Sequence, residues 1–521
     1  MNASTDLAVN GPAMRRALGA SGRRGPRVAP TSILLAILVA LAAVAVGAIV
    51  PRVDPKLLIA GIASCGLMAA IAVRPQIAGY TIIGLTPLIA GIDRGAVIPV
   101  FRPSEAVALL AAAGLTLGAL RRGRVAEFTI PRLRSADVSI MLLCVLSSIV
   151  PILWMLFRHA QVTSDDILYA LTIWKFYAVY IIFRCSIRTV AQVRVCLYTA
   201  MASAGLVAVI AILQALQLFG VTPFLQHYYA PYGVQSEVAN ARGGATLSLP
   251  IAVADLMVFN IAVAFGLLIR GTTRNEARFL VASSILFVMG VLAAGEVTGI
   301  IALLVAGVAL AVVTQRGRYL ARMVPVLIPL AVFLQPVLQK RLGDIDHSSG
   351  LPVSWVGRLD NLRTFFWPRL FTHMNFVLGI RPSARVATTK FASGWVWIES
   401  GYTWLLWGGG IPLLLAYLYF TRANIRVNLP IAKFRRDAVG AAALAVVVAL
   451  VAIAVCMTLD PHLTYRGSAD YLFALLALAA VGTPAVTRTR TETQPRPHLV
   501  PARVSQPNGN GNGNRNGSGP R

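Results

Sequence analysis

Charged residues are scarce in this chain, and acidic residues are the scarcest among them. Only 13% of the 521 residues are charged, and 20 Asp and Glu stand against 47 Lys and Arg. Hydrophobic residues make up 57% of the chain, and the mean hydropathy is +0.71, which excludes an ordinary soluble globular protein. Apolar runs of about 16–25 residues recur along the chain, which is the length needed to cross a bilayer.

Cysteine and histidine are also rare, with five and six residues respectively. The cysteines have no metal-ligand spacing, and His227, His373 and His462 are scattered through the chain. We therefore expect neither a metal site nor a cofactor.

The formal charge of +27 has a simple explanation in a membrane protein. Basic residues concentrate in short connections between apolar runs, where the positive-inside bias places them on the cytoplasmic side. Every alternate connection is basic, so both termini are expected in the cytoplasm and nucleic-acid binding is not expected. The basic connections are 121–134, 184–194, 270–278, 316–322, 422–436 and the tail after 487.

The apolar runs predict an all-α, polytopic integral membrane protein with about 14 transmembrane helices. We expect residues 1–30 to form a disordered, basic cytoplasmic N-terminus, and 487–521, rich in Asn and Gly, to form a disordered cytoplasmic tail. Eleven spans are expected within 31–338 and three within 401–486. They are 31–50, 57–73, 77–92, 105–120, 138–157, 167–183, 195–219, 249–269, 279–294, 300–314, 323–338, 401–421, 438–458 and 470–486.

The long polar segment 339–400 is expected to be an extracytoplasmic loop. It carries eight basic and four acidic residues up to Glu399, together with many aromatic ones. Such a segment suits an anionic ligand at a membrane surface, although an ordinary loop with solvated charges is the alternative. Apolar residues at helical spacing over 359–374 predict an amphipathic helix, bent at Pro368. This helix would lie either on the bilayer or against the helix bundle.

Three polar elements are candidates for chemistry. Arg242 precedes two glycines just before a span, a pattern that lets a backbone and a guanidinium approach phosphate oxygens. Arg358 lies in the long segment, and Glu399 lies at the mouth of the next span among aromatic residues. Partial burial would raise the pKa of Glu399 towards the range of a general base. The alternative for Glu399 is a charge that only stabilises a helix N-terminus, in which case Asp460 or His462 becomes the candidate base.

Two charged residues are expected inside the membrane. Lys175 and Asp255 lie within apolar runs, where unpaired charge is costly. We expect them to pair with each other for assembly, or else to line a transport path.

With these elements together, the chain resembles the superfamily of O-antigen ligases and O-antigen polymerases. In that superfamily the long loop ends in His-Asn-x-Tyr-Leu-x-x-Leu-x-x-x-Gly, and here Tyr402, Leu406 and Gly410 match while Glu399 takes the histidine position. Gly357-Arg358 matches the start of the loop, and Arg242 matches the upstream arginine. The string GEVTG at 295–299 replaces a family Ser-Arg-Gly-Gly element, which favours a polymerase-like or divergent member. The resemblance covers about residues 230–420.

The resemblance implies a metal-independent, inverting glycosyltransferase of the bacterial cytoplasmic membrane. Its donor would be a glycan on a polyprenyl diphosphate. Its other partners would be the lipid bilayer and other polysaccharide-export proteins. Glu399, Arg242 and Arg358 would be catalytic, and the expected substrate-binding residues are Arg363, Arg381, Lys390, Trp397 and Tyr402. The alternatives are a transporter or flippase of lipid-linked glycan or another anion, and a non-catalytic envelope scaffold.

Overall fold

The computed structural model describes residues 55–95, 101–121, 135–229, 242–317, 352–391 and 394–482, with four single positions between 329 and 339. These residues belong to one compact unit that ends at Thr483. The expected first span (31–50), most of the expected eleventh (323–338), the basic N-terminus and the tail lie outside the described residues.

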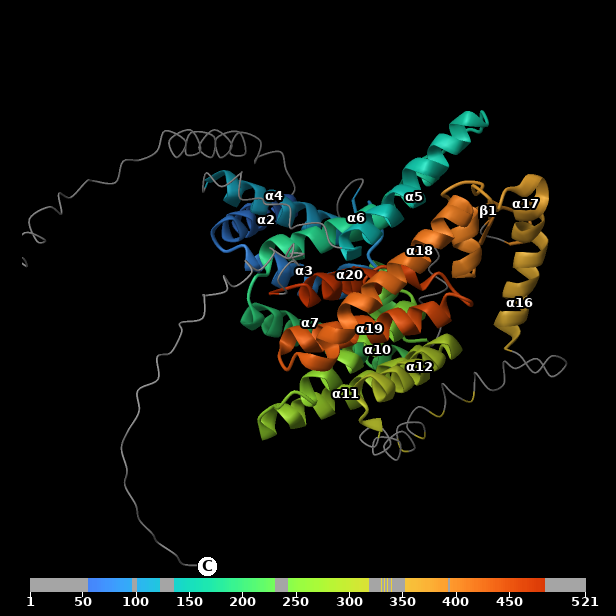
Figure 1. Ribbon diagram of the computed structural model, residues 1–521. Helices are drawn as coiled ribbons and strands as arrows, with labels where there is room; N and C mark the ends of the chain where they lie inside the picture. Colours follow the sequence, from blue (N-terminus) through green and yellow to red (C-terminus); the bar gives the residue numbers. More distant parts are fainter. Residues whose placement is uncertain are drawn as a thin grey trace, which may run out of the picture. The chain divides into compact units, whose positions relative to one another are not determined.

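The described chain is built almost entirely of helices (Figure 1), and each expected span within it coincides with one. Nine helices among the described residues are long and apolar enough to cross a membrane, which confirms the prediction of an all-α, multi-pass membrane protein. The nine are α4 (Pro103–Arg121), α5 (Ser135–Phe157), α6 (Ser164–Ser186), α7 (Val190–Ala215), α10 (Pro250–Leu268), α11 (Arg274–Ala294), α12 (Val297–Thr314), α18 (Gly401–Phe434) and α19 (Ala438–Cys456).

Three further helices are apolar but shorter. They are α3 (Gln76–Ile89), α20 (Ser468–Ala479) and the part of α2 (Pro55–Val73) from Ile59 to Val73. The expected last span therefore ends earlier than predicted, at Ala479 rather than near residue 486. A short helix, α8 (Val221–Tyr228), follows α7.

The centre of the bundle is formed by α10 and α19, the most buried of the candidate spans. Both are apolar around their whole circumference, as expected for helices surrounded by protein. α19 is composed largely of Ala, Val and Gly, and small side chains let neighbouring helices approach closely. α10 contacts α7, α11, α12 and α20 as well as α19, so a polar residue on α10 lies deep in the protein.

The helix α18 is interrupted at Gly410, where φ is 67° and ψ is −158°. The segment 376–381 fills the interruption: the Ile380 N–H donates to the Trp407 carbonyl oxygen (2.7 Å), and the Ile411 N–H donates to the Phe376 carbonyl oxygen (3.0 Å). A side chain at Gly410 would collide with the Val377 carbonyl, and this backbone conformation is accessible essentially only to glycine. Part of the long polar segment thus anchors within a membrane helix.

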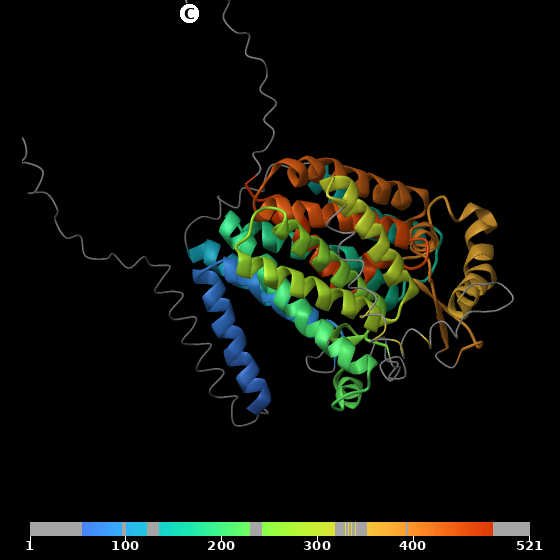
Figure 2. The ribbon, with the colours of Figure 1, turned by 90° about the horizontal axis from the view of Figure 1, so that it is seen from below.

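Within that segment, residues 353–374 form a helical arm, and 385–387 and 395–397 form a hairpin, at one end of the bundle (Figures 1 and 2). The arm consists of α16 (Val353–Asn361), a π-helical turn (Leu362–Phe366), α17 (Trp367–Phe371) and a 3-10 turn (Thr372–Met374). The antiparallel hairpin pairs β1 (Arg385–Ala387) with β2 (Trp395–Trp397). The helix expected over 359–374 is present, with its irregular turn just before Pro368, which lacks the N–H of a regular helix.

The apolar face of this arm packs against protein. Leu362, Phe366 and Leu370 are buried, and the ring of Phe366 meets Trp407 of α18 edge-on with centroids 5.2 Å apart. Trp367 Nε1 donates to Thr403 Oγ1 (3.3 Å). Of the two placements considered, the structure therefore supports the helix that lies against the bundle.

Candidate active site

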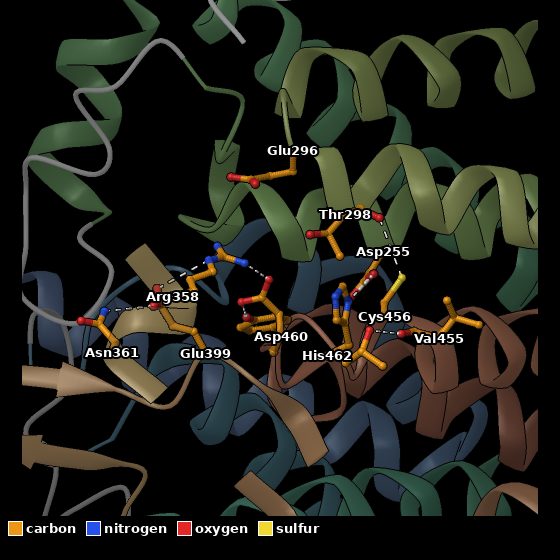
Figure 3. A network of polar contacts seen from close by, with 12 residues as sticks. Asp255, Glu296, Thr298, Arg358, Asn361, Glu399, Val455, Cys456, Asp460 and His462 are labelled. Atoms are coloured by element: carbon orange, nitrogen blue, oxygen red, sulfur yellow. Dashed lines mark hydrogen bonds and ion pairs between the residues drawn. The ribbon is translucent and has the colours of Figure 1, made fainter. Parts of the chain in front are cut away.

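Arg358 lies between two carboxylates that come from distant parts of the chain (Figure 3). Its Nη1 forms an ion pair with Asp460 Oδ2, and its Nε lies 3.8 Å from Glu399 Oε1. Asn361, one helical turn after Arg358, donates to Glu399 Oε2 (3.5 Å). The structure thus brings together Arg358 and Glu399 and adds Asp460 to them.

The local structure explains how these side chains converge. Arg358 is on α16. The arm packs against α18, and this packing holds α16 beside the N-terminal end of α18. Glu399 directly precedes Ser400, whose hydroxyl accepts from the Thr403 N–H and begins α18. Asp460 belongs to the connection between α19 and α20, and its Oδ1 accepts from the Tyr465 hydroxyl (3.2 Å).

The two carboxylates differ in their access to solvent. The Asp460 side chain is 4% exposed, and burial raises its pKa to about 6 although Arg358 opposes the rise. The Glu399 side chain is 35% exposed. Desolvation nevertheless raises its pKa, while Arg358 and Asn361 counteract the shift. Glu399 is therefore the carboxylate that combines a raised pKa with access to a ligand.

A second pair extends the site inwards. His462 Nδ1 lies 2.9 Å from both oxygens of Asp255, and the two side chains are 1% and 3% exposed. Burial alone would lower the pKa of His462, but the Asp255 carboxylate raises it overall. Nε2 of His462 is buried and has no partner among the described residues. The imidazole lies too deep to reach a ligand directly, and its charge acts on Asp460.

Arg242 joins this group through Glu296. Arg242 Nη1 donates to Glu296 Oε1 (3.2 Å), and Glu296 lies at the start of α12. The charge of Glu296 raises the pKa of Asp460 and of Glu399. Glu296 thus neutralises Arg242 in the free protein.

The expected pairing of Lys175 with Asp255 is wrong. Lys175 Nζ lies 3.1 Å from Asp470 Oδ2, and Asp255 pairs with His462. The reason is the order of helices in the bundle, because α6, which carries Lys175, packs directly against α20, which carries Asp470. Lys175 and Asp255 therefore belong to two separate pairs, Lys175–Asp470 and Asp255–His462.

Removing one member of the Lys175–Asp470 pair is expected to destabilise the fold by about 3–5 kcal/mol, because the remaining charge is left unpaired in a buried setting. Lys175→Met or Asp470→Asn alone should lower the yield of folded protein, measured by size-exclusion chromatography in detergent. The double variant should recover part of the loss, whereas Lys175→Met combined with Asp255→Asn should not. Equal recovery in both double variants would contradict the pairing.

The other predicted substrate-binding residues are engaged elsewhere. Arg381 pairs with Asp166, and Lys390 pairs with Asp360 (2.7 Å). The Tyr402 hydroxyl donates to the Ala454 carbonyl oxygen (2.6 Å). The Trp397 ring lies under the Arg385 guanidinium, and Arg363 is exposed on the arm. Arg381, Lys390 and Tyr402 thus make these polar contacts with groups other than Arg358 and Glu399.

Three residues of the site have only a weak signal in the sequence. Asp460 and His462 are alternatives to Glu399 as the base, and their signal is the string Asp-Pro-His between two apolar runs. Glu296 lies in the string GEVTG, which by itself indicates no role in the site. Within the described residues, no group of three or more His, Cys, Asp or Glu is arranged to hold a metal ion.

No family model matches the chain, and no curated protein or solved structure is significantly similar to it. Membership of the O-antigen ligase and polymerase superfamily therefore stays a hypothesis, carried by the motifs alone.

Proposed function

We propose that this protein is a membrane glycosyltransferase that uses a polyprenyl-diphosphate-linked glycan at the outer face of the bacterial cytoplasmic membrane. The proposal includes 14 spans, cytoplasmic termini and an extracytoplasmic segment 339–400. The observation that carries it is the contact between Arg358 and Glu399 at the mouth of α18. A partly exposed carboxylate of raised pKa beside a guanidinium is suited to move a proton next to an anionic leaving group.

In the proposed reaction, Glu399 accepts the proton of an acceptor sugar hydroxyl. The hydroxyl oxygen forms a bond to the anomeric carbon of the donor, and the bond from that carbon to the phosphate oxygen breaks with its electron pair. The diphosphate leaves as an anion. Protonation of Glu399 removes a negative charge close to Arg358, so the guanidinium becomes a stronger partner for the leaving group.

Arg242 supplies the second positive charge in this proposal. Its side chain is 37% exposed, so it can exchange Glu296 for the oxygens of an incoming diphosphate. Paired donors in a planar guanidinium suit such oxygens. The pairing of both arginines with carboxylates keeps the site neutralised before the donor arrives.

Transport of a lipid-linked glycan is the second candidate function, and two observations favour it. α18 is interrupted at Gly410, and interrupted helices are typical of transporters. The buried Asp255–His462 pair is the kind of titratable group that couples transport to protons.

The location of the accumulated donor distinguishes the two functions. In cells that lack the protein, loss of a transferase leaves the lipid-linked glycan in the outer leaflet, whereas loss of a transporter leaves it in the inner leaflet. We expect outer-leaflet accumulation, measured by labelling intact cells with a membrane-impermeant reagent for sugars. Accumulation in the inner leaflet would replace the transferase with the transporter, and unchanged levels would exclude both.

A further inference from the structure

A second arginine-centred site lies at the connection between α5 and α6, built from residues that the proposed reaction does not use. A cavity of about 470 Å³ opens there, and its polar lining is Arg158, Gln161, Thr163 and Arg381. Met155 and Ile380 contribute apolar walls. The volume falls within the range of small-molecule sites.

Arg158 is held firmly in this cavity, but only by neutral groups. Its Nη1 donates to Asn375 Oδ1 (3.0 Å), and its Nη2 donates to the Ile380 carbonyl oxygen (2.7 Å). The guanidinium carbon lies 5.1 Å from the centre of the Trp154 ring. Throughout the described chain, no carboxylate forms an ion pair with Arg158, and its buried Nε has no partner there. Arg158 thus has no counter-charge among the described residues, and its contacts hold the guanidinium in a preformed geometry.

The second cation of the cavity is already neutralised. Arg381 binds the fully buried Asp166 through two bonds, from Nε to Oδ1 (2.9 Å) and from Nη2 to Oδ2 (2.5 Å). Asp166 also accepts from the N–H and the hydroxyl of Thr163 (2.9 and 2.7 Å). This network makes one wall of the cavity rigid and leaves Arg158 as the cation available to an anion.

The setting of Arg158 suggests where that anion comes from. α5 has 23 residues and is therefore about 34 Å long at 1.5 Å per residue, enough to cross the hydrocarbon core. Its last turns expose Leu153, Leu156 and Phe157, the last by 76%. Arg158 follows immediately, at the depth where arginine side chains meet phosphate headgroups. Acyl chains can cover the exposed apolar turns while a phosphate occupies the cavity.

We infer that this cavity is a binding site for a phosphate anion, supplied by the headgroup of an anionic membrane lipid. The ligand would accept hydrogen bonds from the guanidinium of Arg158 and from the side-chain amide of Gln161. The site stands independently of the proposed glycan transfer, because it shares none of the residues placed in that reaction.

Native mass spectrometry of the purified full-length protein, with equal amounts of phosphatidylglycerol and phosphatidylcholine, tests the inference. The wild type should retain phosphatidylglycerol preferentially. Arg158→Gln should weaken its binding by about fivefold or more, the scale of one basic residue at an anionic surface. Gln161→Glu should do the same by repulsion, and it keeps every contact of Arg158 in case the first variant folds poorly.

Arg274→Gln is the matched control, since it removes one exposed positive charge at the first residue of α11. It should leave the lipid preference unchanged. A parallel titration with inorganic phosphate separates the two sources of the anion: binding of phosphate alone that Arg158→Gln abolishes would keep the site but identify a free phosphate as its ligand. Wild-type lipid binding in both cavity variants, or an equal loss in the control, would overturn the inference.

Discussion

Replacing Glu399 by glutamine is expected to slow glycan transfer by about 10²–10⁴-fold, the usual contribution of a positioned general base. Glutamine preserves the size of the side chain and its contact with Asn361, but it cannot accept a proton. Donor binding and the amount of folded protein should therefore stay close to wild type. The measurement is the rate of polymer formation from a lipid-linked donor in proteoliposomes.

The pH dependence of the wild type provides a second readout. A base must be ionised to act, and the raised pKa of Glu399 means that the rate should fall with decreasing pH earlier than an ordinary glutamate would allow. Glu399→His places another titratable group at this position, and we expect a rate above that of Glu399→Gln.

Asp165→Asn is the matched control for this experiment, since Asp165 is another carboxylate paired with an arginine of the long segment, Arg385. It should leave the rate unchanged. A normal rate in Glu399→Gln would reduce Glu399 to a helix-end charge and move the search for a base to Asp460.

Replacing Arg358 by alanine is expected to destabilise the folded protein by about 3–5 kcal/mol at neutral pH. The Arg358 side chain is 20% exposed, and its partner Asp460 is 4% exposed, so the variant leaves a buried carboxylate without a counter-charge. Thermal unfolding in detergent measures the loss. Asp460→Asn in the same chain should recover part of it, because the charge that needed compensation is then removed.

The direction of the pH effect follows from the raised pKa of Asp460. In the wild type this pKa is about 6, and removal of Arg358 raises it further because Arg358 opposes the rise. Below pH 6 Asp460 becomes protonated and no longer needs the guanidinium. The difference in stability between wild type and Arg358→Ala should therefore be largest above the pKa that Asp460 has in the variant, shrink as the pH falls from there to about 6, and stay constant below it.

Lys390→Met serves as a control for stability, because it breaks an exposed ion pair of the same segment, with Asp360. Exposed pairs contribute little, so the unfolding temperature should not change. An equal loss in Lys390→Met, or a pH-independent loss in Arg358→Ala, would show that the Arg358–Asp460 contact is not the source of the effect.

The prediction of the pair Lys175–Asp255 shows where sequence reasoning reached its limit. The cost of charge inside a bilayer correctly indicated that both residues need partners. It could not show that Lys175 pairs with Asp470 and Asp255 with His462, because the choice of partner depends on which helices are neighbours. α6 packs on α20, and the N-terminal part of α10, which carries Asp255, faces the loop that carries His462.

The contacts of the candidate site could likewise not be predicted from spacing or composition. Only the resemblance of the motifs assigned Arg358 and Glu399 to one site, and it predicted no contact between them. Neither spacing nor composition relates two residues 41 positions apart. Asp460 and Glu296 belong to the site because the connection after α19 meets Arg358 and the connection before α12 meets Arg242. Contacts of this kind depend on loop ends that carry no periodic signal.

The sequence alone determined that the protein is an all-α membrane protein and where the helices lie in the described chain, because apolar length and the need to satisfy backbone hydrogen bonds in lipid are local requirements. Tertiary structure decided which charges meet, where α18 breaks around the segment 376–381, and how the arm packs on the bundle. These features depend on which helices pack against each other. The sequences of α10 and α19 carry little information about their neighbours, because both helices are apolar on nearly every side.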